Sequence, residues 1–441
     1  MARAKNRISG ITVRGFKSVC AEQHIDIRPL TILAGANSAG KSSFIQPLLL
    51  LKQTLEAPGD PGALLLDGPN VRFTMAEQLL SRSSGKACSN EFGVKLDLND
   101  GQSLDLTYCR EPGQGFEVKR MAYVGGKDKI EISPGMSHES IEKILPPHLK
   151  SLRQSFEKNK KGAVHWTVLR DRCFLTFDLA SDKEPQERFL FGPYPISPSV
   201  EFIRYIQGVI HLPGLRGNPR RDYPKAAIGG EYQGTFEPYV ASVIAHWQAE
   251  RSDSLAQLGT ALEDLGLTWK VKAEPVDDTR VELKVGRLLH AKQGGARDLV
   301  SIADVGFGVS QALPVVVALL AARPGQLVYL EQPEIHLHPL AQRRLANVLK
   351  KAVDMGVVVV VETHSALLLR EVQTLVAKGE LDPKNIALHW LQRGSDGSTV
   401  AHTAELDKNG AYGNWPEDFD ITELEAEKAY LDAVENREAG K

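Results

Sequence analysis

The chain has 441 residues, of which 42% are hydrophobic and 24% charged, so wholesale disorder is excluded. Its 53 Lys and Arg residues nearly balance 55 Asp and Glu residues, a net charge of −2 that neither supports nor excludes a nucleic-acid partner. No apolar stretch is long enough for a signal peptide or a membrane span, so we expect a cytoplasmic protein without a membrane partner. The cysteines form no CxxC pair, which argues against a zinc site or a disulfide framework. They are Cys20, Cys88, Cys109 and Cys173.

The elements at the start of the chain lead into a glycine-rich turn. Residues 8–33 alternate between apolar and polar and then become apolar, which predicts two strands and a third that runs into the turn. Residues 42–55 have helical spacing, and Pro47 predicts a kink in the early turns of that helix. This strand, turn and helix sequence predicts the start of an α/β head in residues 1–84.

The middle of the chain has a different pattern. Short alternating segments between residues 90 and 195 predict antiparallel sheet, and 137–160 is helical in parts with a basic end. We interpret that basic run as a solvated surface rather than a nucleic-acid contact. Residues 85–195 are therefore predicted to form an inserted α+β lobe.

From residue 196 the pattern returns to strands alternating with helices. Buried strands near 327–330 and 357–362 predict a mostly parallel sheet covered on both faces, and 269–285 predicts a hairpin. We assign 196–405 to the second part of the head and 406–441 to a small module that ends in an acidic helix. No heptad pattern is sustained, so no long coiled coil is expected.

The strongest motif is a complete GxxxxGK[ST] between an apolar strand and a helix. Its glycines let backbone N–H groups surround phosphates, and the helix start favours negative charge. Lys41 is expected to reach the β- and γ-phosphates, and the Ser42 hydroxyl to bind Mg²⁺. The nucleotide-binding residues predicted here are Gly35, Ala36, Asn37, Ser38, Ala39, Gly40, Lys41, Ser42 and Ser43.

Two further strand ends carry polar residues suited to the same chemistry. Leu327–Leu330 is an apolar strand that ends in Glu331, followed by Gln332, Pro333 and Glu334. A carboxylate at the carboxyl end of a buried strand is where a Walker B acid holds the metal, and we assign that role to Glu331. The next buried strand ends with His364, which could contact the γ-phosphate or the attacking water.

With these motifs in this order, the chain resembles the ABC-type P-loop ATPases of the SMC/RecF class, and most closely their OLD-like branch. The segments that carry the resemblance are ITVRGFKSV, PLTILAGANSAGKSS, DVGFGVSQALP, QLVYLEQPEIHLHPLAQ and VVVVVETHS. The resemblance implies that ATP and Mg²⁺ are held between two heads in a homodimer. It implies that a signature segment around Ser310 and Gln311 faces the partner's phosphates, that His364 is the switch histidine, and that the region of His338 crosses to the partner.

One position departs from the family pattern. Most ABC ATPases have a glutamate directly after the Walker B acid as general base, whereas this chain has Gln332. Either Gln332 only orients the water and hydrolysis is slow, or Glu334 supplies the carboxylate. We favour Glu334, because EQPEIHLHP looks like a family variant. The catalytic candidates are therefore Glu334, Gln332, His364 and Lys41.

Basic residues near the motifs are further candidates. Arg14 lies where family members place basic residues near the nucleotide, and Arg216 lies in a proline-rich loop that could offer a guanidinium to phosphate. The alternative for each is a surface ion pair.

Three functions remain open. The first is an ATP-dependent switch that acts with a separately encoded nuclease or toxin, in defence against phage; too little sequence follows His364 for a TOPRIM nuclease of its own. The second is a RecF-like DNA-repair ATPase that binds DNA, and the third is a slow or non-hydrolytic ATP-gated scaffold, suggested by Gln332.

Overall fold

The computed structural model of the chain describes most of its residues. The described residues are 6–83, 86–87, 89–113, 115–126, 128–146, 150, 164–181, 197, 199–229, 231–288, 298–413, 428–434 and 437. Across these residues, the structure has no helix that combines the length and the apolar character needed to cross a membrane.

A six-stranded sheet lies at the centre of the molecule. Its order is β12-β17-β18-β3-β19-β20; the first five strands run parallel and β20 pairs antiparallel with β19. The strands are β12 (Ile210–Leu212), β17 (Leu327–Glu331), β18 (Val358–Thr363), β3 (Leu30–Gly35), β19 (Ile386–Arg393) and β20 (Thr399–Ala404). Because β18 lies between β17 and β3, the strand that ends at Thr363 is the direct neighbour of the strand that leads into the glycine-rich turn.

The two faces of this sheet belong to two hydrophobic cores. Along β18, Val359 and Val361 face one core, whereas Val358 and Val360 face the other, as the period of two in a strand requires. Helices α5 (Val240–Ala249), α6 (Asp253–Asp264), α7 (Phe307–Ala321), α8 (Pro339–Asp354) and α9 (Ala366–Ala377) build the first core. Helix α1 (Gln46–Glu56) contributes to the second.

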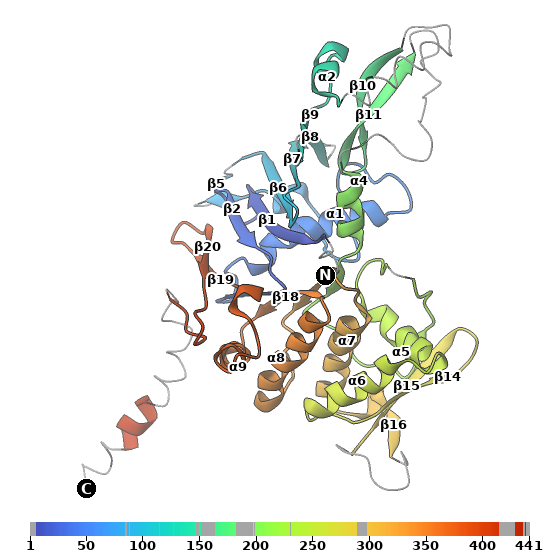
Figure 1. Cartoon of the computed structure of the whole chain (residues 1–441), viewed down its shortest axis with the longest axis vertical. Coiled ribbons are helices and arrows are strands. Elements are labelled where there is room, and N and C mark those ends of the chain that lie inside the picture. Colours follow the sequence, from blue (N-terminus) through green and yellow to red (C-terminus); the bar gives the residue numbers. More distant parts are fainter. Residues whose placement is uncertain are drawn as a thin grey trace.

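A second six-stranded sheet is antiparallel and has the order β2-β1-β6-β7-β8-β9. Its strands are β1 (Ile8–Arg14), β2 (Gln23–Asp26), β6 (Glu91–Leu98), β7 (Ser103–Glu111), β8 (Gly115–Gly125) and β9 (Asp128–Ile132). Figure 1 shows α5 to α9 at one end of the molecule and this sheet toward the other. Since β1 pairs with β6, the sheet crosses the boundary predicted between residues 84 and 85.

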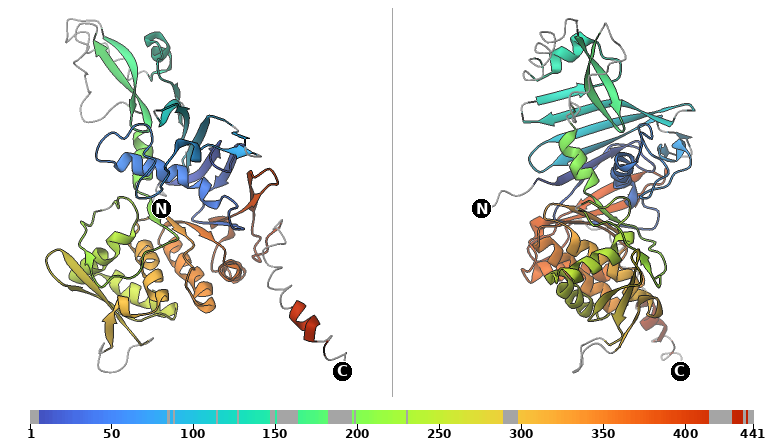
Figure 2. Two further views of the ribbon diagram at one scale, coloured as in Figure 1. Left: turned by 180° about the vertical axis from the view of Figure 1, so that it is seen from behind. Right: turned by 90° about the vertical axis from the view of Figure 1, so that its right-hand side faces the viewer.

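Smaller elements complete the chain. Helices α2 (His138–Ile144) and α4 (Val200–Gln207) and the hairpin of β10 (Val164–Asp171) and β11 (Phe174–Ser181) flank the antiparallel sheet (Figure 2). A third sheet combines β13 (Tyr223–Pro224), β14 (Val271–Pro275), β15 (Arg280–Gly286) and β16 (Leu299–Ser301). Short strands β4 (Arg82–Ser83) and β5 (Lys86–Ala87) pair with each other.

The predicted class, an α/β head with a mostly parallel sheet and an antiparallel lobe, is confirmed. The predicted hairpin is β14–β15, and the longest described helix has 16 residues, far short of a coiled-coil arm. Pro47, where a kink is expected, lies in the first turn of α1, where its missing N–H has no helical acceptor to lose. The basic end of 137–160 lies largely outside the described residues, as do residues 414–427 of the C-terminal module.

Candidate functional site

The turn that follows β3 depends on its glycines. Gly35 and Gly40 have φ angles of 147° and 91°, which side chains rarely adopt. A Cβ atom on Gly40 would lie 2.4 Å from Thr399 Oγ1 and 2.5 Å from Ser18 Oγ, so the backbone here passes directly against its neighbours. A 3₁₀ turn, Lys41–Phe44, then leads into α1. This strand–turn–helix arrangement points the first N–H groups of the helix into the loop.

Lys41 is held inside this loop. Its side chain is buried, and Nζ donates to the carbonyl oxygens of Gly35 at 3.0 Å and Ala36 at 2.9 Å. Burial lowers the pKa of Lys41, while the carboxylates of Glu362 and Glu334 act in the opposite direction. The ammonium group is thus positioned at the loop by two backbone carbonyls and lies within the field of two acids.

A cavity of about 400 Å³ opens beside the loop. Eight of its lining residues were predicted from the sequence: Asn37, Ser38, Gly40, Lys41, Ser42, Ser43, Gln332 and His364. Five were not: Lys17, Ser18, Gln46, Glu362 and Arg393. Lys17 and Ser18 lie shortly after β1, in the FKS segment, a position that could have suggested them. Nothing in the local pattern marks Gln46 or Arg393.

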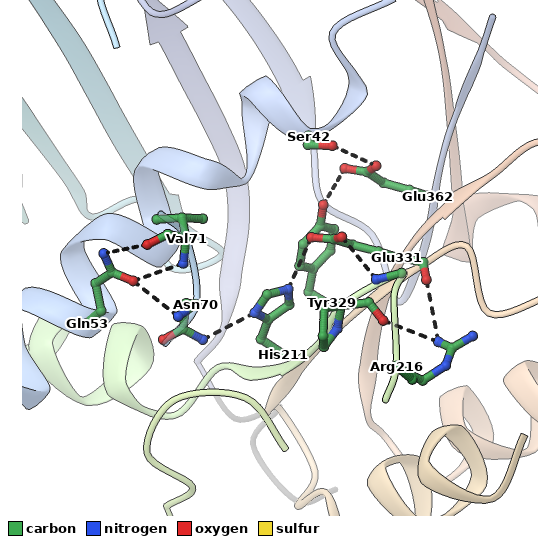
Figure 3. A network of polar contacts seen from close by, with 11 residues as sticks. Ser42, Gln53, Asn70, Val71, His211, Arg216, Tyr329, Glu331 and Glu362 are labelled. Carbon is green, nitrogen blue, oxygen red and sulfur yellow. Dashed lines mark hydrogen bonds and ion pairs between the residues drawn. The ribbon is translucent and has the colours of Figure 1, made fainter. Parts of the chain in front are cut away.

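The Ser42 hydroxyl is bonded to an acid on β18. Ser42 Oγ donates to Glu362 Oε2 at 3.0 Å, and the buried Tyr329 hydroxyl donates to Glu362 Oε1 (Figure 3). Burial raises the pKa of Glu362 to about 7, and the nearby carboxylate of Glu331 adds to this rise. Glu362 is therefore a buried acid that lines the cavity and contacts the glycine-rich turn directly.

Glu331 has different partners. Its Oε1 lies 3.1 Å from His211 Nε2, and its Oε2 accepts from the Gly214 backbone N–H at 3.1 Å. Burial opposes ionisation, but the hydrogen bonds from His211 and Gly214 outweigh it and lower the pKa of Glu331. Asn70 contacts the other ring nitrogen of His211 at 3.2 Å (Figure 3). Glu331 is thus an ionised acid held from the β12 side, and it is not among the cavity-lining residues.

Gln332 and Glu334 occupy different environments. Gln332 lines the cavity, has a φ of 43° and donates its N–H to the Glu362 carbonyl at 2.8 Å. Glu334 is buried; its Oε1 accepts from Thr363 Oγ1 at 2.6 Å and from the His364 N–H at 2.8 Å. Its Oε2 has no partner among the described residues. Burial, with Lys41 nearby, lowers the pKa of His364 and favours its neutral imidazole.

The residues of the predicted signature segment are mostly engaged within the subunit. Ser310 is buried and its hydroxyl donates to the Phe307 carbonyl at 3.0 Å. Gln311 is buried as well and accepts from Arg216 Nε at 3.2 Å. The exposed residues of the segment are Asp304, Gly306 and Phe307, and the Phe307 side chain is 51% exposed.

Neither predicted arginine lines the cavity. Arg14 donates to Asp105 Oδ1 and Thr107 Oγ1, both at 2.8 Å, on the antiparallel sheet. Arg216 is buried behind the turn that follows β17, where its guanidinium reaches the carbonyl oxygens of Glu331 at 3.5 Å and Gln332 at 3.3 Å.

Comparison with known proteins places part of this site in a family. Residues 211–370 match the family model described as "AAA domain, putative AbiEii toxin, Type IV TA system". These residues form the AAA-like region of the chain. It contains the signature segment, Glu331 to Glu334 and His364, while the glycine-rich turn precedes it in the chain. The match supports the expected P-loop ATPase class for this region of the chain. No curated protein matches the sequence.

The fold of the chain is also similar to those of solved SMC heads, at low identity. An SMC head bound to the C-winged helix domain of ScpA is 14% identical (TM-score 0.47) over 91% of this chain and 98% of that one. The SMC head domain from Thermotoga maritima is 12% identical (TM-score 0.40) over 91% of this chain and 100% of that one. An SMC head with an extended coiled coil from Pyrococcus furiosus, bound to the C-terminal domain of ScpA, is 12% identical (TM-score 0.43; 98% and 100%).

The donor atoms beside the glycine-rich turn suit the cofactors that this family implies. Ser42 Oγ and the carboxylates of Glu331 and Glu362 are hard oxygen donors of the kind Mg²⁺ prefers. Among the described residues, no group of three or more His, Cys, Asp and Glu side chains could hold a metal alone. A Mg²⁺ ion here would therefore need oxygens from phosphate and water, as it does in nucleotide sites.

Proposed function

We propose that the chain binds ATP with Mg²⁺ in the cavity beside the glycine-rich turn and hydrolyses it, and that this cycle switches a separate effector protein. The observation that carries the proposal is the convergence of Lys41 and Ser42 with Glu362 at one cavity, although Glu362 lies 320 residues from Ser42 in the chain. When bound, Mg²⁺ would neutralise phosphate charge and orient the γ-phosphate for attack by water.

Each residue has a role that follows from its position. The N–H groups of the turn and the Lys41 ammonium bind phosphate oxygens, and Lys41 leaves its two carbonyl partners to do so. Ser42 would supply a hydroxyl ligand for Mg²⁺, and Glu362 accepts a hydrogen bond from that hydroxyl. Gln332 faces the cavity and orients the attacking water. Glu334, a buried carboxylate that accepts the His364 N–H just outside the cavity lining, is assigned to accept the proton. His364, neutral and held by Glu334 through its N–H, contacts the γ-phosphate.

An ATP-dependent homodimer is supported by exposed apolar side chains close to the turn after β17. Phe307 is 51% exposed and its ring lies 5.8 Å from that of His336. Leu340 is 46% exposed near the start of α8, and Leu215, next to Gly214, is 91% exposed. Large apolar side chains left in water at this place suit a protein–protein contact. With Ser310 and Gln311 buried, Gly306 and Phe307 would form the part of the signature segment that meets the partner.

The nature of the effector is supported by the matched family alone. Its description names a putative toxin of a toxin–antitoxin system, which fits an ATPase that controls a toxin or nuclease during defence against phage. Isolating the protein from its native host in the presence of a non-hydrolysable ATP analogue and identifying the proteins retained would test this part. Recovery of the ATPase alone would speak against a separate effector.

The nucleotide site itself is tested by Lys41→Ala. Titration with a fluorescent ATP analogue and Mg²⁺ should show affinity lowered by about 100-fold, because a buried cation aimed at phosphate is lost. Lys225→Ala, at an exposed lysine whose Nζ donates to the Asp277 carbonyl, is the matched control and should bind like the parent. Equal affinity of Lys41→Ala and parent would disprove the proposed function.

A second candidate is a switch that responds to ATP binding and hydrolyses slowly or not at all. It is favoured by Gln332, because the side chain that lines the cavity directly after β17 is an amide and not a carboxylate. Phosphate release under saturating ATP separates the two candidates: the hydrolytic switch requires release that Lys41→Ala abolishes, whereas the slow or non-hydrolytic scaffold binds ATP and releases little or no phosphate.

A further inference from the structure

The acid bonded to the Ser42 hydroxyl is not the one at the end of β17. Strands β17 and β18 are parallel neighbours, and Glu331 lies directly opposite Glu362 in their register. Both carboxylates therefore project from the same face of the sheet, toward the side of α1. Since β18 is one strand closer to β3, Glu362 is the nearer of the two to the glycine-rich turn. The order of the strands thus decides which acid meets Ser42.

Glu331 and Glu362 have different hydrogen-bond partners, which gives them different roles. Both oxygens of Glu331 are occupied by groups on the far side, His211 and the Gly214 N–H. Glu362 instead receives Ser42 at Oε2, while Tyr329 holds Oε1. Tyr329 is buried, and its ring stacks on that of His211 with the two ring centroids 5.4 Å apart. This packing holds the Tyr329 hydroxyl in place beside Glu362. Glu362 is therefore fixed at one oxygen, and its other oxygen faces the metal-binding hydroxyl and the cavity.

We propose that Glu362, fixed by Tyr329, is a positioning residue for Mg²⁺ at the phosphate site, where it would hold water ligands of the metal beside Ser42. Glu331 contributes mainly by linking the end of β17 to β12. The inference rests on the proposed function, because it concerns the same nucleotide site. Mg²⁺ in proteins usually keeps several water ligands, and a carboxylate that is hydrogen-bonded to a metal ligand can accept hydrogen bonds from these waters. Loss of such a carboxylate typically lowers metal affinity by about 10- to 100-fold.

The test separates metal positioning from nucleotide binding. A fluorescent ATP analogue is titrated into the full chain with excess EDTA and then with increasing Mg²⁺, for the parent, Glu362→Gln, Glu331→Gln and Tyr329→Phe. For Glu362→Gln we expect the half-saturating Mg²⁺ concentration to rise at least about tenfold while affinity in EDTA is unchanged or higher, since a negative charge facing phosphate is gone. Tyr329→Phe should show a smaller rise of the same kind, and Glu331→Gln the smallest.

A matched control and a second variant keep the test decisive. Glu282→Gln makes the same chemical change on β15, outside the cavity, and should leave both titrations unchanged. If Glu362→Gln does not fold, as judged by its thermal melt, Tyr329→Phe alone carries the test. A Mg²⁺ requirement that changes in Glu331→Gln but not in Glu362→Gln or Tyr329→Phe overturns the inference. The proposed function fails separately, because it requires that the parent bind Mg·ATP at all.

Discussion

The guanidinium of Arg216 donates through Nε to the side-chain oxygen of Gln311 at 3.2 Å. The same group reaches the carbonyls of Glu331 and Gln332, and Gln311 Nε2 in turn donates to the carbonyl of Gly217 at 3.4 Å. One buried side chain therefore links the start of α7 to the turn that follows β17. Burial lowers the pKa of Arg216, with Glu237 the largest of the opposing influences.

Replacing Arg216 should uncouple these two segments. Arg216→Lys keeps the charge but loses the planar set of donors. We expect ATP affinity to stay within about threefold of the parent and turnover to fall about tenfold, because the turn is no longer fixed to α7. Steady-state phosphate release together with ATP titration checks this. Arg221→Lys, at an exposed arginine paired with Asp304, is the control. If Arg216→Lys turned over ATP as fast as this control, the linkage would be refuted.

The two candidates for handling the attacking water should differ in their effects on turnover. Glu334→Gln removes the only carboxylate among them and should lower turnover by about 100-fold or more, the usual worth of a general base. Gln332→Ala should lower it less, since an amide only orients water. Both variants should still bind ATP. Parent-like turnover in Glu334→Gln rules out Glu334 as the base.

The proposed dimer contact can be tested at Phe307. Phe307→Asp places a charge at the exposed apolar position and should weaken ATP-dependent self-association by about tenfold or more, as expected for an aromatic contact residue. Sedimentation velocity with and without Mg·ATP measures the effect. Val276→Asp changes a residue that is 56% exposed in the β14–β15 connection and should associate like the parent. Unaltered association of Phe307→Asp would remove this residue from the interface.

A buried ion pair supports the helix that follows the glycine-rich turn. Lys52, fully buried on α1, pairs with Glu56 and donates to the carbonyls of Gln207 at 2.9 Å and Tyr232 at 2.8 Å. Lys52→Met leaves Glu56 buried without its cation and should cost about 3 to 5 kcal/mol in the free energy of unfolding, measured by urea denaturation. Adding Glu56→Gln should recover part of the loss. A single variant as stable as the parent would contradict this.

Stability of the nucleotide-free protein should depend on pH through Glu362. Its pKa is raised from 4.5 to about 7, so between these values the folded state binds more protons than the unfolded state. The free energy of unfolding therefore falls as pH rises through this window, by at most about 1.4 kcal/mol per pH unit. The glutamine in Glu362→Gln cannot ionise. The melting temperature of this variant, relative to that of the parent, should therefore increase as pH rises from about 5 to about 8. Melting curves that stay parallel across this range would show that Glu362 is not the group responsible.

The sequence predicts the parts of this molecule that local patterns determine. The glycine-rich turn, the strand ending at Glu331 and the strand ending before His364 follow from apolar runs and glycine spacing, and the structure has them at one edge of one sheet. The role of Glu362 could not be predicted, because it depends on β18 lying between β17 and β3. The partners of Glu331 depend likewise on β12, which pairs with β17 from more than 100 residues away. The burial of Ser310 depends on the packing of α7.

The contact between Gly40 and Thr399 has a practical consequence. Thr399 Oγ1 donates to the Ala39 carbonyl at 2.8 Å, so the start of β20 braces the glycine-rich turn from the other end of the chain. The exposed connection between β19 and β20 would look like a convenient place to insert an epitope tag or a fluorescent reporter. An insertion there would pull on the phosphate loop itself, and a loss of ATP binding in such a fusion would say nothing about the residues that bind the nucleotide.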